Sequence, residues 1–207
     1  MRRRALAPAA AAFGLAGCAA RAPEPAGVGR GRVVVLRGLA NVFSTGMDRL
    51  AARLAAAGYR VELGNHLEWQ AAAGRLVAAE RSSRLPRPVA VIGHSLGADD
   101  AIRLAGTAGE AGVATDLLVT FDPVWVSRVS TGPRRVLNFY LALGIWGRSL
   151  GAAPGFTGTI ENVDVGSLGV THFDIEKNAA LHARVLATLE QEGAPTAPQA
   201  SVAGPEA

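Results

Sequence analysis

The sequence contains one serine in a setting that favours nucleophilic chemistry. Ser95 lies in the run Gly93-His94-Ser95-Leu96-Gly97, which has the pattern G-x-S-x-G. The apolar residues 88–92 before it are typical of a buried strand, and residues 96–104 after it are typical of a helix. A strand that turns abruptly into a helix leaves no room for a β-carbon at the two glycine positions. Such a turn projects the serine hydroxyl above the sheet edge and points the partly positive helix N-terminus at the reacting group, so we predict that Ser95 is a nucleophile.

A serine nucleophile needs a base, and the sequence offers four histidines. After a turn of this kind the partners follow in the order serine, acid, histidine, and both His66 and His94 precede Ser95. His182 lies within the last predicted helix, where a packed or solvated histidine is the usual finding. His172 lies in the loop between the last predicted strand and that helix, and we predict that it is the base.

The base in turn needs a carboxylate that fixes its tautomer, and three aspartates compete for this role. Asp122 closes the strand-like run 117–121, and Pro123 then ends the strand. Asp164 follows a later strand and is the main competitor. Asp174 is the lesser one, because it lies only two residues from His172 and begins a helix, where aspartate is commonly a cap. We predict Asp122.

The oxyanion of the reaction needs two backbone N–H groups. One should belong to Leu96, the residue after the nucleophile. The other should come from the turn 37–41 that follows the first strand, with Leu39 the best choice because it follows the turn glycine Gly38. The alternative is that this segment is only a strand-to-helix connection, and its register is open by a residue or two.

The elements that must position these residues alternate along the chain. Short apolar runs alternate with longer helical patterns, which predicts an α/β fold with a parallel sheet covered on both faces. The predicted helices begin near residues 46, 67, 96 and 174. The predicted strands span residues 33–36, 60–63, 89–93, 116–121, 136–140 and 159–163.

With these residues in place, the chain resembles the α/β-hydrolase superfamily, and within it small lipase-like and thioesterase-like bacterial members. The resemblance covers residues 32–192 and rests on Gly93 to Gly97, Phe121-Asp122-Pro123 and Thr171-His172. It implies an α/β-hydrolase fold with a reduced, mostly parallel sheet of about six strands flanked by helices, since the first two strands of the prototype are missing. It also implies hydrolysis of a carboxylic ester or thioester through an acyl-enzyme, with no metal and no cofactor. Arg37-Gly38 stands where many relatives have His-Gly, which leaves the backbone role intact.

Composition limits the other possibilities. With 207 residues and 49% hydrophobic residues, the chain can bury one sizeable core, and we expect one catalytic domain and a monomer. The net charge of +4 comes from arginines scattered among alanine and glycine, which argues against nucleic acid as a partner. The single cysteine, Cys18, excludes an internal disulfide and a cysteine-based zinc site.

The N-terminal segment has the layout of a signal peptide. Three arginines and an alanine-rich apolar run, too short to span a bilayer, lead to Leu15-Ala16-Gly17-Cys18, which resembles a bacterial lipobox. We expect cleavage before Cys18, lipidation of that cysteine, and export to the cell envelope on the periplasmic side or at the outer membrane. The alternative is an ordinary cleavage near residues 20–22. Residues 19–31 are expected to be a flexible tether, and residues 193–207 a disordered tail.

The predicted partner is a small acyl ester or thioester, and two alternatives stay open. The first is a non-catalytic envelope lipoprotein that uses the fold as a binding module, and the second is acyl transfer to an acceptor other than water. Residues 141–158 either form one short helix over the site or belong to the core; they are too few for a lid of several helices.

Overall fold

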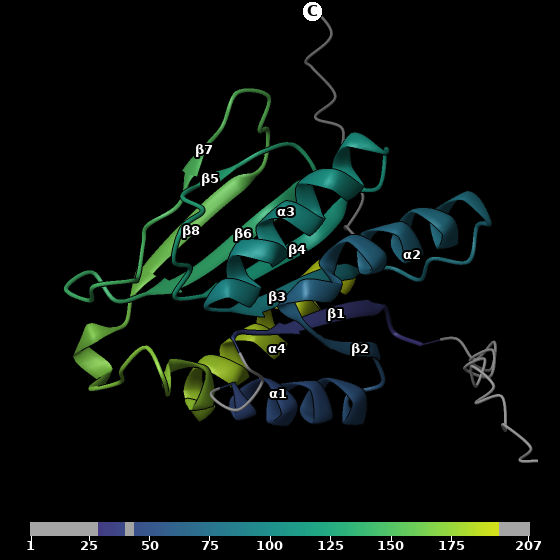
Figure 1. Ribbon diagram of the computed structural model, residues 1–207. Coiled ribbons are helices and arrows are strands. Elements are labelled where there is room, and N and C mark those ends of the chain that lie inside the picture. The colour runs from purple at the N-terminus through teal and green to yellow at the C-terminus, as the bar shows by residue number, and fades with distance from the viewer. Residues whose placement is uncertain (1–28, 40–43, 195–207) are drawn as a thin grey trace, which may run out of the picture.

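A computed structural model describes residues 29–39 and 44–194. Its main sheet has six strands, all parallel, in the order β2-β1-β3-β4-β6-β8 (Figure 1). These strands are β1 (Arg32–Arg37), β2 (Arg60–Asn65), β3 (Val89–His94), β4 (Thr115–Phe121), β6 (Pro133–Tyr140) and β8 (Thr159–Asp164). The prediction of a reduced parallel sheet of about six strands is confirmed, and each of the six predicted strands is present.

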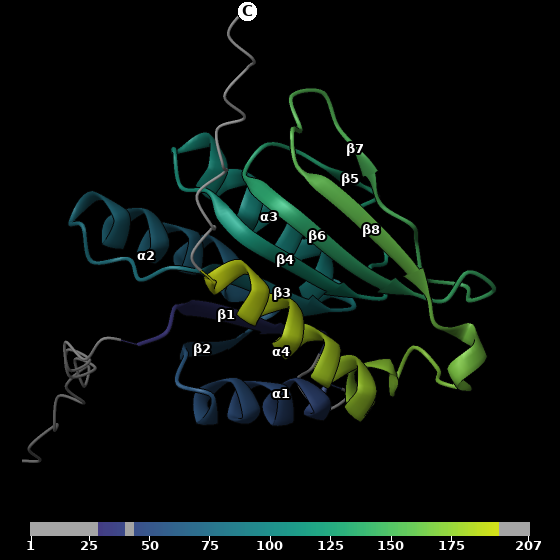
Figure 2. The same ribbon diagram turned by 180° about the vertical axis from the view of Figure 1, so that it is seen from behind.

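Helices cover both faces of the sheet, as Figures 1 and 2 show from opposite sides. Helices α1 (Thr45–Ala56) and α4 (Ala179–Gly193) lie on one face, where Leu50 and Val185 join the core cluster that includes Phe121. Helices α2 (Trp69–Arg81) and α3 (Leu96–Glu110) lie on the other face, where Leu76 and Leu104 pack in a second cluster. The central strands β3 and β4 are buried on both faces, which explains the unbroken apolar runs 89–92 and 117–119 within them.

The turn from β3 into α3 holds Ser95 in a backbone conformation that L-residues rarely adopt, with φ 57° and ψ −126°. A β-carbon at Gly93 would lie 2.1 Å from the carbonyl oxygen of Gly97. A β-carbon at Gly97 would lie 2.5 Å from the carbonyl oxygens of Leu36 and Arg37. Both glycines are therefore required by close backbone contact.

Two predicted helices begin later than expected. The second predicted start, near residue 67, falls in the short 3₁₀ helix η1 (His66–Glu68), and α2 begins at Trp69. The last helix does not begin near Asp174. A short 3₁₀ helix, η3 (Ile175–Lys177), intervenes, and Asn178 then caps α4 by accepting hydrogen bonds from the N–H groups of Ala180 and Leu181.

The segment 141–158 contains no α-helix, so the short helix considered over the site is absent from it. It forms turns and the two-residue strand β7 (Gly151–Ala152), which pairs with β5 (Arg128–Val129) in a small separate sheet. Neither short strand is among the predicted elements. Short 3₁₀ helix η2 (Gly166–Leu168) follows β8.

Several expectations lie outside the described residues. They concern the signal peptide and lipobox with Cys18, most of the tether, and the tail from residue 195. Within the part of the chain that the structure describes, no helix is long and apolar enough to cross a membrane.

The close contact at Gly97 gives a first prediction. We expect Gly97→Ala to lower the free energy of unfolding by about 2 kcal/mol or more, because the new β-carbon meets backbone oxygens that cannot move away. Gly74→Ala is the matched control: Gly74 lies in α2, has nothing within 4 Å of its virtual β-carbon, and should gain about 1 kcal/mol of helix propensity. Urea unfolding of both variants checks this, and equal effects would contradict the packing argument.

Candidate active site

Three side chains form a continuous hydrogen-bonded chain at the carboxyl ends of the strands. The Ser95 hydroxyl lies 2.9 Å from His172 Nε2, and His172 Nδ1 lies 2.6 Å from Asp122 Oδ2. All three residues are buried. The structure thus brings together the predicted nucleophile, base and acid, although Ser95 and His172 are 77 residues apart.

The sheet positions two of these residues through bonds that continue its ladder beyond the strand ends. The Ser95 N–H donates to the Phe121 carbonyl at 2.9 Å, and the Asp122 N–H donates to the Phe139 carbonyl at 2.8 Å. Asp122, like Ser95, has a positive φ, 52°. Such strain in non-glycine residues is usually retained at functional positions. His172 reaches the same edge from the loop between β8 and α4.

Both carboxylate oxygens of Asp122 have partners, because Oδ1 accepts the Leu141 N–H at 2.9 Å. The competing aspartates serve their own loops. Asp164 Oδ1 accepts the N–H groups of Ala142 and Gly166, and Asp174 Oδ1 accepts the N–H of Thr171 at 2.5 Å. Geometry therefore favours Asp122 over Asp164 and Asp174 as the partner of His172.

A cavity of about 340 Å³ opens in front of Ser95. The Trp146 ring contacts the His172 imidazole at a tilt of 46°, with ring centroids 4.7 Å apart, and Phe173 stands edge-on to both rings. Trp125 is 70% exposed and forms part of the rim. The lining is mostly apolar and consists of Leu39, Ser44, His94, Ser95, Leu96, Val124, Trp125, Trp146, His172 and Phe173.

The apolar residues of segment 141–158 divide between core and site. Leu141 and Phe156 pack into the two core clusters, whereas Leu143 and Ile145 are exposed. Trp146, from the same segment, lines the cavity.

Leu39 and Leu96, the predicted oxyanion donors, both line this cavity. Leu96 is the first residue of α3, where an N–H has no partner within the helix. The N–H of Gly38 is already used, because it donates to the Ser44 hydroxyl at 3.0 Å. The Leu39 N–H makes no hydrogen bond with any residue that the structure describes.

His94 is 1% exposed, and both of its ring nitrogens have partners. Nδ1 lies 2.8 Å from the Ser44 hydroxyl, and Nε2 lies 2.8 Å from the carbonyl oxygen of His172. Burial lowers the pKa of His94 from 6.5 to about 4, so its imidazole is neutral at neutral pH.

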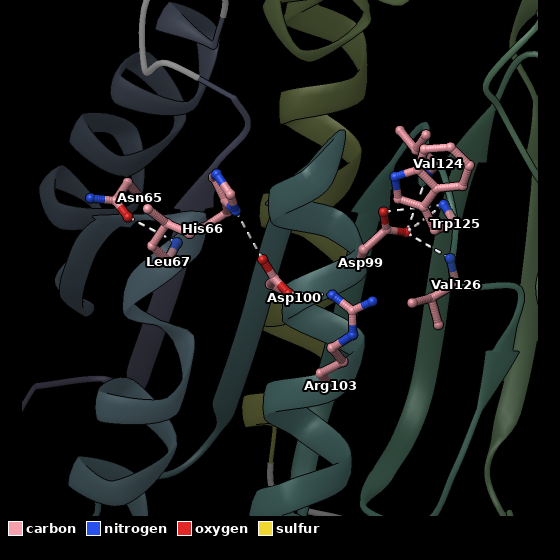
Figure 3. A network of polar contacts seen from close by, with 9 residues as sticks. All are labelled: Asn65, His66, Leu67, Asp99, Asp100, Arg103, Val124, Trp125 and Val126. Atoms are coloured by element: carbon pink, nitrogen blue, oxygen red, sulfur yellow. Dashed lines mark hydrogen bonds and ion pairs between the residues drawn. The ribbon is translucent and has the colours of Figure 1, made fainter.

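Asp99, in the first turn of α3, holds one wall of the cavity. Its buried carboxylate accepts the backbone N–H groups of Val124, Trp125 and Val126 at 2.9 to 3.1 Å (Figure 3). Desolvation raises the pKa of Asp99, and these three donors oppose that rise. The carboxylate thus fixes the loop that follows Asp122.

A second histidine–aspartate pair lies on the other side of α3. His66 Nδ1 is 3.1 Å from Asp100 Oδ2, and Arg103 donates to the other oxygen of Asp100 at 2.6 Å (Figure 3). This pair ties the segment after β2 to α3. In the described ranges, no group of three or more histidine, cysteine and acidic side chains could hold a metal ion.

No protein-family model and no curated protein matches the chain. Among solved structures, the thioesterase RedJ of the prodiginine biosynthetic pathway in Streptomyces coelicolor is 15% identical, with a TM-score of 0.49, over 89% of this chain and 91% of that one. YbtT, a type II thioesterase of the yersiniabactin pathway, is 13% identical, with a TM-score of 0.47, over 82% and 97% of the two chains. A protein described as a member of the alpha/beta hydrolase superfamily, from Xanthomonas campestris pv. campestris, is 15% identical, with a TM-score of 0.42, over 77% and 99%.

Sequence reasoning missed Ser44 and Asp99, and it did not recognise what His94 binds. Trp146 belongs to segment 141–158, and its contact with the His172 ring has no signal in the sequence. Ser44 precedes a helix, where serine is a common cap, yet it makes no capping bond here and binds His94. Asp99, one turn after the nucleophile, is a weak signal, because acidic residues are common in first helical turns.

The low pKa of His94 gives a prediction on stability. Below pH 6.5 the unfolded chain protonates this histidine while the folded protein does not, until the pH reaches about 4. Stability should therefore fall as the pH falls through this window, by up to about 3 kcal/mol from this residue. We expect urea unfolding of wild type and His94→Asn to show a flatter pH dependence in the variant, and parallel curves would contradict a buried neutral His94.

Proposed function

We propose that this protein is a serine hydrolase that cleaves a carboxylic ester or thioester through a Ser95–His172–Asp122 triad. The observation that carries the proposal is the continuous hydrogen-bonded chain from the Ser95 hydroxyl through the His172 imidazole to the Asp122 carboxylate. Ser95, at one end of this chain, lines an apolar cavity of about 340 Å³, which is large enough for an acyl group. The comparisons with solved structures are too distant to bear on the activity, so the proposal rests on the site.

In the first half of the reaction, His172 Nε2 takes the Ser95 proton as the oxygen attacks the substrate carbonyl carbon. The tetrahedral oxyanion accepts hydrogen bonds from the N–H groups of Leu39 and Leu96. His172 then gives the proton to the leaving alcohol or thiol as its bond to the acyl carbon breaks. In the second half, His172 takes a proton from water, the resulting hydroxide attacks the acyl-enzyme, and the proton returns to Ser95 as the acid is released.

Asp122 makes this sequence possible by fixing the imidazole. Its Oδ2 accepts the His172 Nδ1–H at 2.6 Å, which leaves Nε2 with the lone pair that faces Ser95. The carboxylate also stabilises the imidazolium that forms when His172 takes the proton. Its own orientation is fixed by the Leu141 N–H.

The cavity lining favours an uncharged, apolar acyl group. Among the lining residues that the structure describes there is no acidic side chain, lysine or arginine, and six of them are apolar or aromatic. Trp125 and Trp146 are large flat walls, and no helix of segment 141–158 encloses the mouth. The site therefore suits short to medium acyl chains.

The nucleophile is tested by Ser95→Ala. We expect this variant to fold and to lose on the order of 10⁶-fold in kcat for a p-nitrophenyl ester, because the groups of a triad act as a unit. Wild type should be labelled by a fluorophosphonate probe and the variant should not. A wild-type protein that resists labelling and hydrolyses no ester would support a non-catalytic binding module.

The acid is tested by a matched pair of variants. Asp122→Asn should lower kcat on the order of 10⁴-fold, because the amide cannot hold the productive tautomer of His172. Asp164→Asn is the control and should stay within about threefold of wild type, since Asp164 binds loop N–H groups. Steady-state kinetics checks both, and reversed losses would assign the acid to Asp164.

Chain-length dependence tests the cavity. In a p-nitrophenyl ester series, kcat/KM should rise about fourfold for each CH₂ of the acyl chain that contacts the cavity lining, because burying one CH₂ contributes about 0.8 kcal/mol. The increase should level off at medium chain length. Trp125→Ala should reduce this slope because it removes part of the rim. A continued rise to long chains with a jump at the micelle threshold would refute an open site.

A further inference from the structure

We propose that His94 and Ser44 are positioning residues that hold the oxyanion turn and the catalytic base in one fixed arrangement. This inference rests on the proposed function. The geometry that carries it is an unbroken relay of three hydrogen bonds: the Gly38 N–H to Ser44 Oγ at 3.0 Å, Ser44 Oγ to His94 Nδ1 at 2.8 Å, and His94 Nε2 to the His172 carbonyl oxygen at 2.8 Å.

The direction of every bond in the relay follows from its two ends. A backbone N–H can only donate and a backbone carbonyl can only accept. His94 must therefore carry its proton on Nε2 to reach the His172 carbonyl, and its Nδ1 must accept the Ser44 hydroxyl proton. The Ser44 oxygen then accepts from Gly38. One tautomer and one hydroxyl orientation satisfy the whole relay.

The relay joins parts of the site that come from distant segments. Gly38 precedes Leu39, the proposed oxyanion donor, and His94 precedes Ser95 at the end of β3. The far end is the backbone of His172 itself, 78 residues after His94. Because Ser44 and His94 are each 1% exposed, water cannot replace a lost partner easily, and the relay is a rigid link.

In the proposed reaction, the positive charge that forms on His172 also favours a neutral His94. The rings of His94 and His172 have centroids 5.2 Å apart. When His172 becomes an imidazolium during the reaction, a second positive charge at that distance would oppose it. Burial, which keeps the pKa of His94 low, removes this conflict.

A role in positioning predicts a kinetic effect separate from a stability effect. Displacing a reacting group by about 1 Å can cost 10²-fold in rate. We expect Ser44→Ala to lower kcat about tenfold to hundredfold with KM changed less than about threefold, because the displaced groups contact the transition state. His94→Gln can still donate an amide N–H to the His172 carbonyl from the end of its side chain, but it has only methylene groups where His94 Nδ1 accepts from Ser44, so it should resemble Ser44→Ala.

The closing experiment measures kcat and KM of wild type, Ser44→Ala, His94→Gln, the double variant and Thr120→Val, with thermal unfolding of each. Thr120→Val is the matched control, because it removes another buried hydrogen bond, Thr120 Oγ1 to Asn138 Oδ1 at 2.7 Å, outside the relay. It should lower the melting temperature and leave kcat within about twofold of wild type. The double variant should lose no more in kcat than the worse single variant, because both substitutions interrupt the same relay at the Ser44–His94 bond.

Each outcome decides the inference. If wild type hydrolyses esters with Ser95 required, and folded Ser44→Ala retains its kcat, the relay is only structural and the inference fails while the proposed function stands. Losses in kcat that multiply in the double variant, or that Thr120→Val reproduces, also overturn it. If His94→Gln fails to fold, the comparison of kcat between Ser44→Ala and Thr120→Val still decides whether the relay acts on catalysis. A wild type whose activity does not need Ser95 refutes the proposed function instead.

Discussion

The arrangement of the site depends on the abrupt turn at Ser95, where a parallel strand becomes a helix within one residue. The turn is possible only because Gly93 and Gly97 carry no side chain, and it keeps Ser95 at a positive φ. Its strain is balanced by the surrounding backbone, since the Ser95 N–H binds the Phe121 carbonyl of the neighbouring strand. This one turn therefore fixes the positions of the Ser95 hydroxyl, the N-terminus of α3 and the Leu96 N–H relative to one another.

Around this turn, buried polar side chains bind backbone groups of loops that the sheet does not reach. Asp99 accepts hydrogen bonds from three N–H groups of the loop after β4, and Asp122 accepts one from the Leu141 N–H. His94 donates one to the His172 carbonyl. Each would be costly if unpaired, because a buried polar group without a partner destabilises the fold. Since all three are paired, that same cost now opposes any displacement of the loops. The loops of the candidate site are thus bound to the sheet and to α3 by side chains as well as by the backbone.

The sheet and the three residues of the hydrogen-bonded chain could be predicted because their signals are local. Periodicity gives β3 and β4, and the G-x-S-x-G spacing gives Ser95. The acid was a choice among Asp122, Asp164 and Asp174, and it followed from the strand that each one closes. The late start of α4 was missed because Asn178 caps it four residues beyond the expected start near residue 174, and propensity does not locate caps well. The roles of Ser44, Trp146 and Asp99 depend on contacts between distant segments, which no periodicity encodes.

The role of His94 likewise depends on contacts between distant segments, so it can be recognised only in the structure. In the sequence it is the residue before the predicted nucleophile, and no local pattern indicates what it binds. In the folded protein its two nitrogens have different partners: Nδ1 binds Ser44, which in turn binds the proposed oxyanion turn at Gly38, and Nε2 binds the loop of His172. An apolar residue of similar size would fill the space but would leave the Ser44 hydroxyl proton and the His172 carbonyl without partners, and a positively charged one would repel the imidazolium of the proposed reaction. A neutral histidine meets both demands, because it donates at one nitrogen and accepts at the other without carrying charge.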